Sequence, residues 1–144
     1  MEKFSTNDLI TQVVNKLFVY TDLQDWDKLQ SEVFTEEILF DMRSLGGINS
    51  KTSAKIICAT WEEGFTGIDA INHLAGNYLI EIAENEATVF AYATATHYKK
   101  LATNGKTRDF VGTYDLHLVK KEVGWRIDQF KYNLKYSIGN VDFT

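Results

Sequence analysis

Apolar residues in the first part of the chain recur at the spacing of amphipathic helices. Between residues 6 and 22 they fall three or four positions apart, which places them on one face of a helix that Ser5 or Thr6 can cap. A second, short helix is predicted from Asp25 and a third from Thr52, with an edge or crossing strand over residues 38–43 between them. The apolar faces consist of Leu9, Ile10, Val13, Val14, Leu17 and Phe18 in the first helix, Trp26, Leu29 and Val33 in the second, and Ala54, Ile57, Cys58, Trp61 and Phe65 in the third.

After Gly67 the pattern changes to the alternation that is typical of strands. Four strands are predicted, over residues 71–82, 87–100, 108–121 and 125–136. Hairpin turns are expected at residues 84–86, at Asn104-Gly105 and at residues 122–124. Because helices come first and an antiparallel meander follows, the order indicates an α+β fold in which a sheet wraps around helices.

Neither face of the two long central strands is polar. In the strand over residues 87–100, one face carries small side chains and ends at His97, whereas the other face is aromatic. A half-exposed sheet usually has one polar face, so we expect both faces to be covered. The small-residue face should border a hollow. The other face should form a homodimer interface through Phe90, Tyr92, Tyr98, Tyr114, Leu116 and Leu118.

Composition narrows the class of protein. The chain has 144 residues, a length that suits a single domain over residues 1–144. Its formal net charge of −5 argues against nucleic-acid binding. Its single cysteine, Cys58, excludes a disulfide framework and a cysteine zinc cage, and is expected in the core. We see neither a signal peptide nor an apolar stretch near the roughly twenty residues that cross a bilayer. We therefore expect no membrane partner and a cytoplasmic location.

Three titratable residues are candidates for chemistry. Asp22 continues the apolar ridge of the first helix, so its carboxylate should point inward, although it could simply begin the turn. His73 and His97 lie in predicted strands among small or apolar neighbours. There, burial lowers the pKa of a histidine and a nearby carboxylate raises it. A histidine paired with an aspartate is the usual general acid–base arrangement. The alternative is that both histidines are structural.

Other chemistry has less support. His117 lies on a strand near lysines and is expected at the surface or an interface. Two histidines and an aspartate could bind a metal ion, but no close spacing such as His-x-x-x-His occurs. The chain also lacks a glycine-rich phosphate loop, a nucleophile elbow and a dinucleotide fingerprint. We therefore expect neither a metal nor a cofactor.

Several short motifs together resemble a known family. They are Asp22-Leu-Gln-Asp-Trp-Asp-Lys-Leu29, Asp41-Met-Arg-Ser44, Asn72-His-Leu-Ala-Gly-Asn77, His97-Tyr98, Thr113-Tyr-Asp-Leu-His117 and Gly124-Trp-Arg-Ile127. In order and spacing they resemble the SnoaL-like branch of the nuclear transport factor 2-like (NTF2-like) superfamily, and most specifically the scytalone dehydratases. The resemblance implies a cone-shaped α+β half-barrel. In it, a strongly curved mixed or antiparallel sheet wraps around three N-terminal helices and encloses a pocket.

The resemblance also implies roles for individual residues. Asp22 and His97 would form the aspartate–histidine pair, and His73 would be a second histidine in the pocket. Thr113 and Asp115 would contact substrate. The C-terminal segment, residues 136–143, would close the pocket.

Two positions depart from the family pattern. Thr21 and Met42 occupy the places of two tyrosines that hold a carbonyl-polarising water in the dehydratases. The loss of a phenol removes a donor to developing enolate charge, so scytalone is not the expected substrate. Tyr20 is adjacent to Thr21, although it should face another direction on the helix. We include Tyr20, Met42 and Trp61 among the candidate substrate-binding residues.

The sequence thus predicts a cofactor-independent lyase or isomerase. It would dehydrate or isomerise a small apolar cyclic or aromatic molecule by acid–base chemistry in an enclosed pocket. The alternative is a non-catalytic ligand-binding or assembly domain of the same fold, which Met42 favours because it cannot donate a hydrogen bond. An epoxide hydrolase of the same superfamily is a third, weaker hypothesis.

Overall fold

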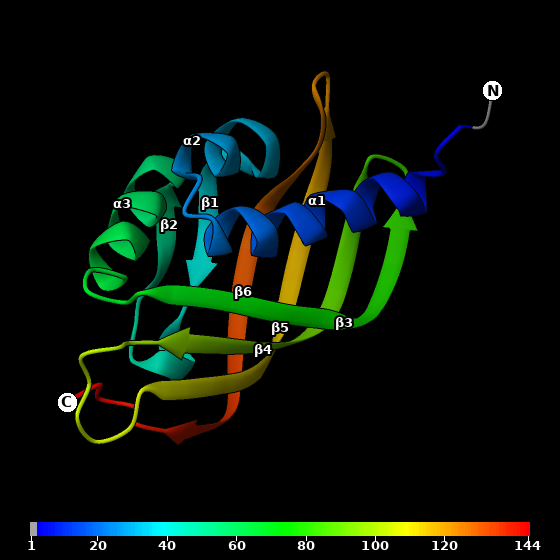
Figure 1. The fold of residues 1–144 in the computed structure, drawn as a ribbon. Coiled ribbons are helices and arrows are strands. Elements are labelled where there is room, and N and C mark those ends of the chain that lie inside the picture. The colour runs from blue at the N-terminus through cyan, green and yellow to red at the C-terminus, as the bar shows by residue number, and fades with distance from the viewer. Residues whose placement is uncertain (1–2) are drawn as a thin grey trace.

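The computed structural model describes residues 3–144, in which three helices precede or interrupt six strands (Figure 1). The helices are α1 (Thr6–Asp22), α2 (Trp26–Lys28), which continues as a π-helical turn (Leu29–Val33), and α3 (Ala54–Gly64). The strands are β1 (Phe34–Asp41), β2 (Asn49–Ser53), β3 (Ala70–Ala83), β4 (Glu86–Tyr98), β5 (Thr107–Lys121) and β6 (Gly124–Gly139). A 3-10 turn (Arg43–Leu45) follows β1. Within this part of the chain, no helix combines the length and the apolarity that a membrane crossing requires.

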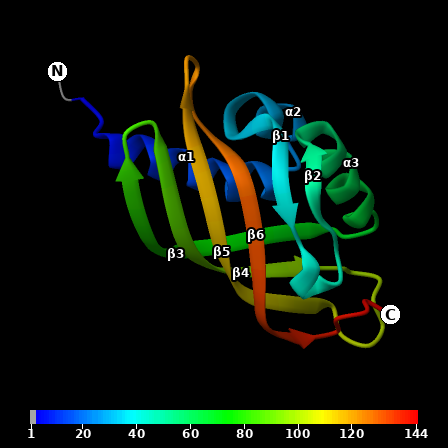
Figure 2. The same ribbon diagram turned by 180° about the vertical axis from the view of Figure 1, so that it is seen from behind.

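All six strands belong to one curved, open sheet in the order β2-β1-β6-β5-β4-β3. Every neighbouring pair is antiparallel except β1 and β6, which run parallel, so the sheet is mixed. The three helices lie on one side of the sheet, as the opposite views in Figures 1 and 2 show. This confirms the predicted α+β cone, with its three N-terminal helices and its four C-terminal strands.

The sequence pattern was less informative about the first two strands. β1 lies inside the sheet between β2 and β6 (Figure 2), whereas the sequence suggested an edge or crossing strand. β2 is the edge strand, and hydropathy did not predict it. Its five residues, Asn49–Ser53, are polar and mostly exposed, so they carry no apolar alternation that could reveal a strand.

Helix α1 begins and ends at residues with defined partners. The Ser5 side chain accepts a hydrogen bond from the Asp8 backbone N–H at 3.1 Å, and the Asp8 carboxylate accepts one from the Ser5 N–H at 3.0 Å. This reciprocal pair satisfies two backbone donors of the helix start. The apolar face of α1 is buried against the sheet, and the helix ends at Asp22, beside strand β3.

The core depends on how β4 and β5 are paired. Ala91 lies directly opposite Tyr114, and Val89 opposite Leu116. Directly opposite residues of an antiparallel pair point to the same face, so Ala91 and Val89 of β4 lie beside larger side chains of β5. Tyr114 and Leu116 are accordingly 7% and 1% exposed, and both belong to the core that packs against the helices.

This register corrects the predicted dimer surface. Tyr114, Leu116 and Leu118 point into the core, not outward. Sequence alternation shows which residues of one strand share a face, but it does not show which face of the next strand coincides with it. Phe90, Tyr92 and Tyr98 do point to the outer face of β4, opposite the buried alanines. The homodimer itself stays a prediction.

Close packing around Gly112 yields a test of this core. A Cβ at Gly112 would lie 2.5 Å from the hydroxyl of Tyr132 and from the backbone oxygen of Asn133. We expect Gly112→Ala to lower the free energy of unfolding by about 1–3 kcal/mol, because the added methyl group overpacks the strand pair. Gly76→Ala in β3 is the matched control, since nothing lies within 4 Å of its Cβ position. Equal stabilities of the two variants in urea unfolding would contradict this packing.

Candidate active site

A cavity of about 440 Å³ lies between the helices and the concave face of the sheet. This volume falls within the range of about 300–1,000 Å³ that is usual for small-molecule sites. Aromatic rings dominate its walls and come from α1, from α3 and the residue that follows it, and from strands β5 and β6: Phe18, Trp61, Phe65, Phe110, Phe130. Few polar side chains reach it: Thr21, His73, His97, Arg108, Tyr114, Tyr132.

His73 is held by the last residue of helix α1. One oxygen of Asp22 lies 2.6 Å from His73 Nδ1, and the other accepts the backbone N–H of His73 at 2.9 Å. The two side chains are 19% and 10% exposed, so this contact is largely shielded from water. Because a carboxylate can only accept, Nδ1 carries the hydrogen of the neutral ring, and Nε2 is then the nitrogen with the lone pair. Within residues 3–144, no group hydrogen-bonds to that Nε2.

His97 has the opposite kind of partner. Arg108, directly across from it on β5, donates a hydrogen bond from Nε to His97 Nδ1 at 3.1 Å. A guanidinium can only donate, so Nδ1 keeps its lone pair and Nε2 carries the hydrogen. Burial lowers the pKa of His97 to about 4, and the positive charge of Arg108 acts in the same direction, as does His73 when its ring is protonated. The negative charges of Asp22 and Asp109 offset part of this effect. His97 is therefore neutral at pH 7.

The structure corrects the expected aspartate–histidine pair. Asp22 bonds to His73, not to His97. His73 lies opposite Ala95, so the two histidines are diagonal neighbours on one face of the sheet. The end of α1 reaches β3 and not β4, which brings Asp22 to His73. All three predicted catalytic residues are thus close together, in a different pairing.

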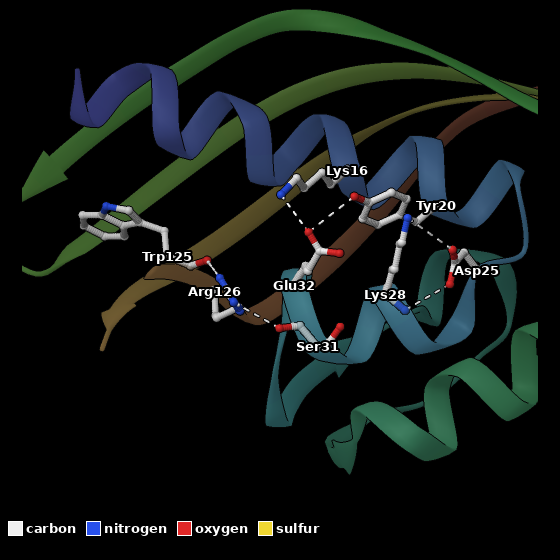
Figure 3. A network of polar contacts seen from close by, with 8 residues as sticks. All are labelled: Lys16, Tyr20, Asp25, Lys28, Ser31, Glu32, Trp125 and Arg126. Atoms are coloured by element: carbon white, nitrogen blue, oxygen red, sulfur yellow. Dashed lines mark hydrogen bonds and ion pairs between the residues drawn. The ribbon is translucent and has the colours of Figure 1, made fainter. Parts of the chain in front are cut away.

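The predicted substrate-binding residues divide between cavity and surface. Met42 and Trp61 line the cavity, as expected. Tyr20 does not: it lies on another side of α1, where its hydroxyl donates to Glu32 at 3.5 Å and Lys28 lies over its ring (Figure 3). One step along a helix turns a side chain by about 100°, and Thr21 takes the position that faces the cavity.

Thr113 and Asp115, which the resemblance implied as substrate contacts, do not line the cavity and lie on the outer face of β5. There, Asn133 Nδ2 donates to Asp115 at 2.8 Å and to Thr113 at 3.3 Å. The residues of β5 that face the cavity are those with even numbers, including Phe110 and Tyr114. A shift of one residue along a strand reverses the face, so residues with odd numbers in this part of β5 point away from the cavity.

Sequence reasoning missed five polar or aromatic groups of the site. Arg108, Phe110 and Tyr114 of β5 line the cavity together with Phe130 and Tyr132 of β6, but this face of β5 was assigned to a dimer contact. The hydroxyl of Tyr132 is buried and has no hydrogen-bond partner in residues 3–144. Burial raises the pKa of Tyr132 to about 12 and, with the neighbouring Tyr132 and Asp22, also raises the pKa of Tyr114. Both phenols therefore remain donors at neutral pH.

The C-terminal segment covers part of the cavity, as the resemblance implied. Val141 lines the cavity, and its carbonyl accepts a hydrogen bond from Arg108 Nη1 at 2.7 Å. The ring of Phe143 lies 4.3 Å from the centre of the same guanidinium. Arg108 thus connects the wall of the cavity to the end of the chain.

The remaining candidates lie outside the cavity. His117 is on the outer face, where Nδ1 lies 2.6 Å from Asp128 and Nε2 lies 3.1 Å from Glu86. Cys58 is buried in α3, as predicted, and burial with the charges of Asp27 and Glu62 raises the pKa of its thiol to about 11. In residues 3–144, no group of three or more histidine, cysteine or acidic side chains is arranged to hold a metal ion.

An open α+β cone whose helices and concave sheet enclose an apolar cavity defines the NTF2-like class of protein. Residues 3–131 match the SnoaL-like domain, and the chain belongs to this family. No curated protein sequence matches the chain significantly.

Solved structures share this fold at low sequence identity. The Kfla4162 protein from Kribbella flavida is 22% identical, with a TM-score of 0.89 over 96% of this chain and 95% of that one. A candidate scytalone dehydratase from Novosphingobium aromaticivorans is 18% identical, with a TM-score of 0.74 over 90% and 84%. The hexachlorocyclohexane dehydrochlorinase LinA-type3 from Novosphingobium barchaimii is 8% identical, with a TM-score of 0.79 over 94% and 90%. At these identities the similarity concerns the fold alone.

The buried neutral histidine predicts a specific pH dependence of stability. His97 titrates at about 4 in the folded chain and at about 6.5 when unfolded, so the unfolded chain binds the extra proton between these values. Stability should therefore fall as the pH falls from 6.5 to 4, by about 3 kcal/mol from this residue, with no further loss below pH 4. Urea unfolding of the wild type and of His97→Gln at both pH values measures this contribution. The same loss in both proteins would contradict it.

Proposed function

We propose that this protein is a cofactor-independent enzyme that removes a proton from a small, mostly apolar cyclic molecule, in a dehydration, isomerisation or related elimination. One observation carries the proposal: His73 lines the apolar cavity with Nδ1 bonded to Asp22 at 2.6 Å. Its Nε2 has no hydrogen-bond partner in residues 3–144. A histidine oriented in this way by a carboxylate is suited to act as a general base.

The roles of the two residues follow from their contacts. His73 Nε2 accepts the proton from carbon, and the electron pair of the broken C–H bond forms the new double bond. In an elimination, the leaving group departs with its own bonding pair from the neighbouring carbon. Asp22 keeps the ring in the tautomer that leaves Nε2 basic, and its charge stabilises the imidazolium that forms. In an isomerisation, the proton on Nε2 returns to another carbon.

The walls of the cavity support an apolar substrate. Seven aromatic side chains of phenylalanine, tyrosine or tryptophan line it, and the other polar side chains are those of Thr21, Arg108 and the two histidines. A charge that develops in such an apolar, water-poor site interacts more strongly with its neighbours than it would in water. The expected partner is therefore a small hydrophobic or aromatic molecule with one polar group.

The names of two structural relatives agree with this reaction class. One is a candidate dehydratase and another is a dehydrochlorinase, so one is named for the loss of water and the other for the loss of hydrogen chloride. Both eliminations remove a proton together with a leaving group. The dyad of Asp22 and His73 provides the proton acceptor that either reaction needs.

The proposal is tested by proton exchange with solvent. Wild-type protein would be incubated in D₂O with a panel of small cyclic hydroxyketones, unsaturated ketones and chlorinated cyclohexanes, and followed by NMR. We expect deuterium incorporation or product formation with at least one compound. His73→Gln should lower that rate by about 10²–10⁴-fold, the usual contribution of a general base.

Two further variants sharpen this test. Asp22→Asn should also slow the reaction, because an amide no longer stabilises the imidazolium. His117→Gln is the matched control, since His117 forms a contact of the same 2.6 Å length with Asp128 on the outer face. Full activity of His73→Gln, or equal losses in His73→Gln and His117→Gln, would count against His73 as the base.

The cavity also suits a non-catalytic ligand carrier, and Met42 is the observation that favours this second function. Its thioether lines the wall where the related dehydratases would place a phenol. Trp61 lines the same cavity, so its fluorescence reports binding directly. Quenching by members of the panel, without exchange or product at any pH between 5 and 9, would favour the carrier.

A further inference from the structure

The two histidines of the cavity have partners of opposite sign at the same ring atom. Asp22 lies at Nδ1 of His73, and Arg108 lies at Nδ1 of His97. A carboxylate only accepts and a guanidinium only donates. The ring hydrogens are therefore on different nitrogens, and each Nε2 is the nitrogen left for a ligand.

We infer that Arg108 is a positioning residue that holds His97 as a neutral donor through Nε2–H, so that His73 accepts a proton while His97 binds an acceptor atom of the same molecule. The assignment rests on the proposed function for the role of His73. The state of His97 follows from its own contacts with Arg108. Diagonal neighbours on adjacent strands are about 7–8 Å apart, so one small molecule can contact both rings.

The surroundings of Arg108 favour this role over a purely structural one. Within residues 3–144, no carboxylate forms an ion pair with its guanidinium, so its charge is not neutralised by direct contact. Its contacts are His97 Nδ1, the carbonyl of Val141, and the rings of Phe110 and Phe143 at 5.3 and 4.3 Å. A protonated His97 would place a second positive charge beside this guanidinium. The arrangement therefore favours the neutral imidazole.

A neutral histidine donor joins the phenols of Tyr114 and Tyr132, which also line the cavity. Thr21 and Met42 stand where the resemblance implied two further phenols, and the thioether of Met42 cannot donate a hydrogen bond. A preorganised N–H donor in an apolar site stabilises negative charge that develops on an acceptor atom. A neutral imidazole is able to act as such an electrophile. The site thus favours ligands whose oxygen, or comparable acceptor, lies a few bonds from the proton that His73 removes.

The experiment is NMR of protein labelled with ¹⁵N-histidine, using two-bond ¹H–¹⁵N correlations at pH 7. We expect His97 to carry its hydrogen on Nε2 and His73 to carry its hydrogen on Nδ1. In Arg108→Met, His97 should become a mixture of tautomers and its pKa should rise, whereas His73 should keep its tautomer. These spectra need no substrate, so a failure here is distinguishable from a failure of the proposed reaction.

Two control variants distinguish the effect of losing Arg108 on the His97 tautomer from general effects of mutation. Arg126 is a half-buried arginine that donates to the carbonyls of Ser31 and Trp125 (Figure 3), so Arg126→Met should leave His97 unchanged. Phe143→Ala removes the ring over the Arg108 guanidinium but not the Nε bond, and should also leave the tautomer unchanged.

Three results would overturn the inference. The first is a wild-type spectrum in which His97 carries its hydrogen on Nδ1. This measurement does not depend on the folding of any variant. The second is an Arg108→Met protein with unchanged tautomer and pKa of His97. The third is a change in Phe143→Ala as large as in Arg108→Met, which would assign the effect to the C-terminal segment.

Discussion

The packing of large β5 side chains beside small β4 side chains determines where this protein has a core and where it has a cavity. Where Leu116 and Leu118 lie beside Val89 and Ala87, the helices cover the sheet and the interior is filled. Toward the other end of the pair, α1 has ended at Asp22, and the side chains on the concave face border open space. The cavity therefore follows from the length of one helix and the register of two strands.

The same end of the sheet carries the titratable and charged groups that form the site. Polar atoms are costly to bury without partners, and those of the cavity are mostly paired: Asp22 with His73, and Arg108 with His97 and Val141. These pairings give two chemically identical imidazoles different properties, because a carboxylate orients one and a guanidinium the other. Sites that perform acid–base chemistry often place two titratable groups of the same kind in different environments.

Particular residues show how far prediction from the sequence could go. The position of Asp22 on the α1 ridge and of both histidines on strand faces was sufficient to propose them as one site, and the structure brings them together. Their pairing could not be predicted, because it depends on which strand the end of α1 reaches. The outward direction of Thr113 and Asp115 was hidden for a related reason, since periodicity distinguishes two faces of a strand without showing which one faces the helices.

By itself, the sequence determined the local elements: amphipathic spacing specified the helices, alternation specified β3 to β6, and short motifs indicated the SnoaL-like family, to which the chain belongs. Local periodicity is a property of neighbouring residues, so one chain is enough to show it. Only the tertiary structure decided the inward direction of Tyr114, the polar edge strand β2, and the contact of Arg108 with His97. These features arise from the register between segments distant in the chain, which no local pattern contains.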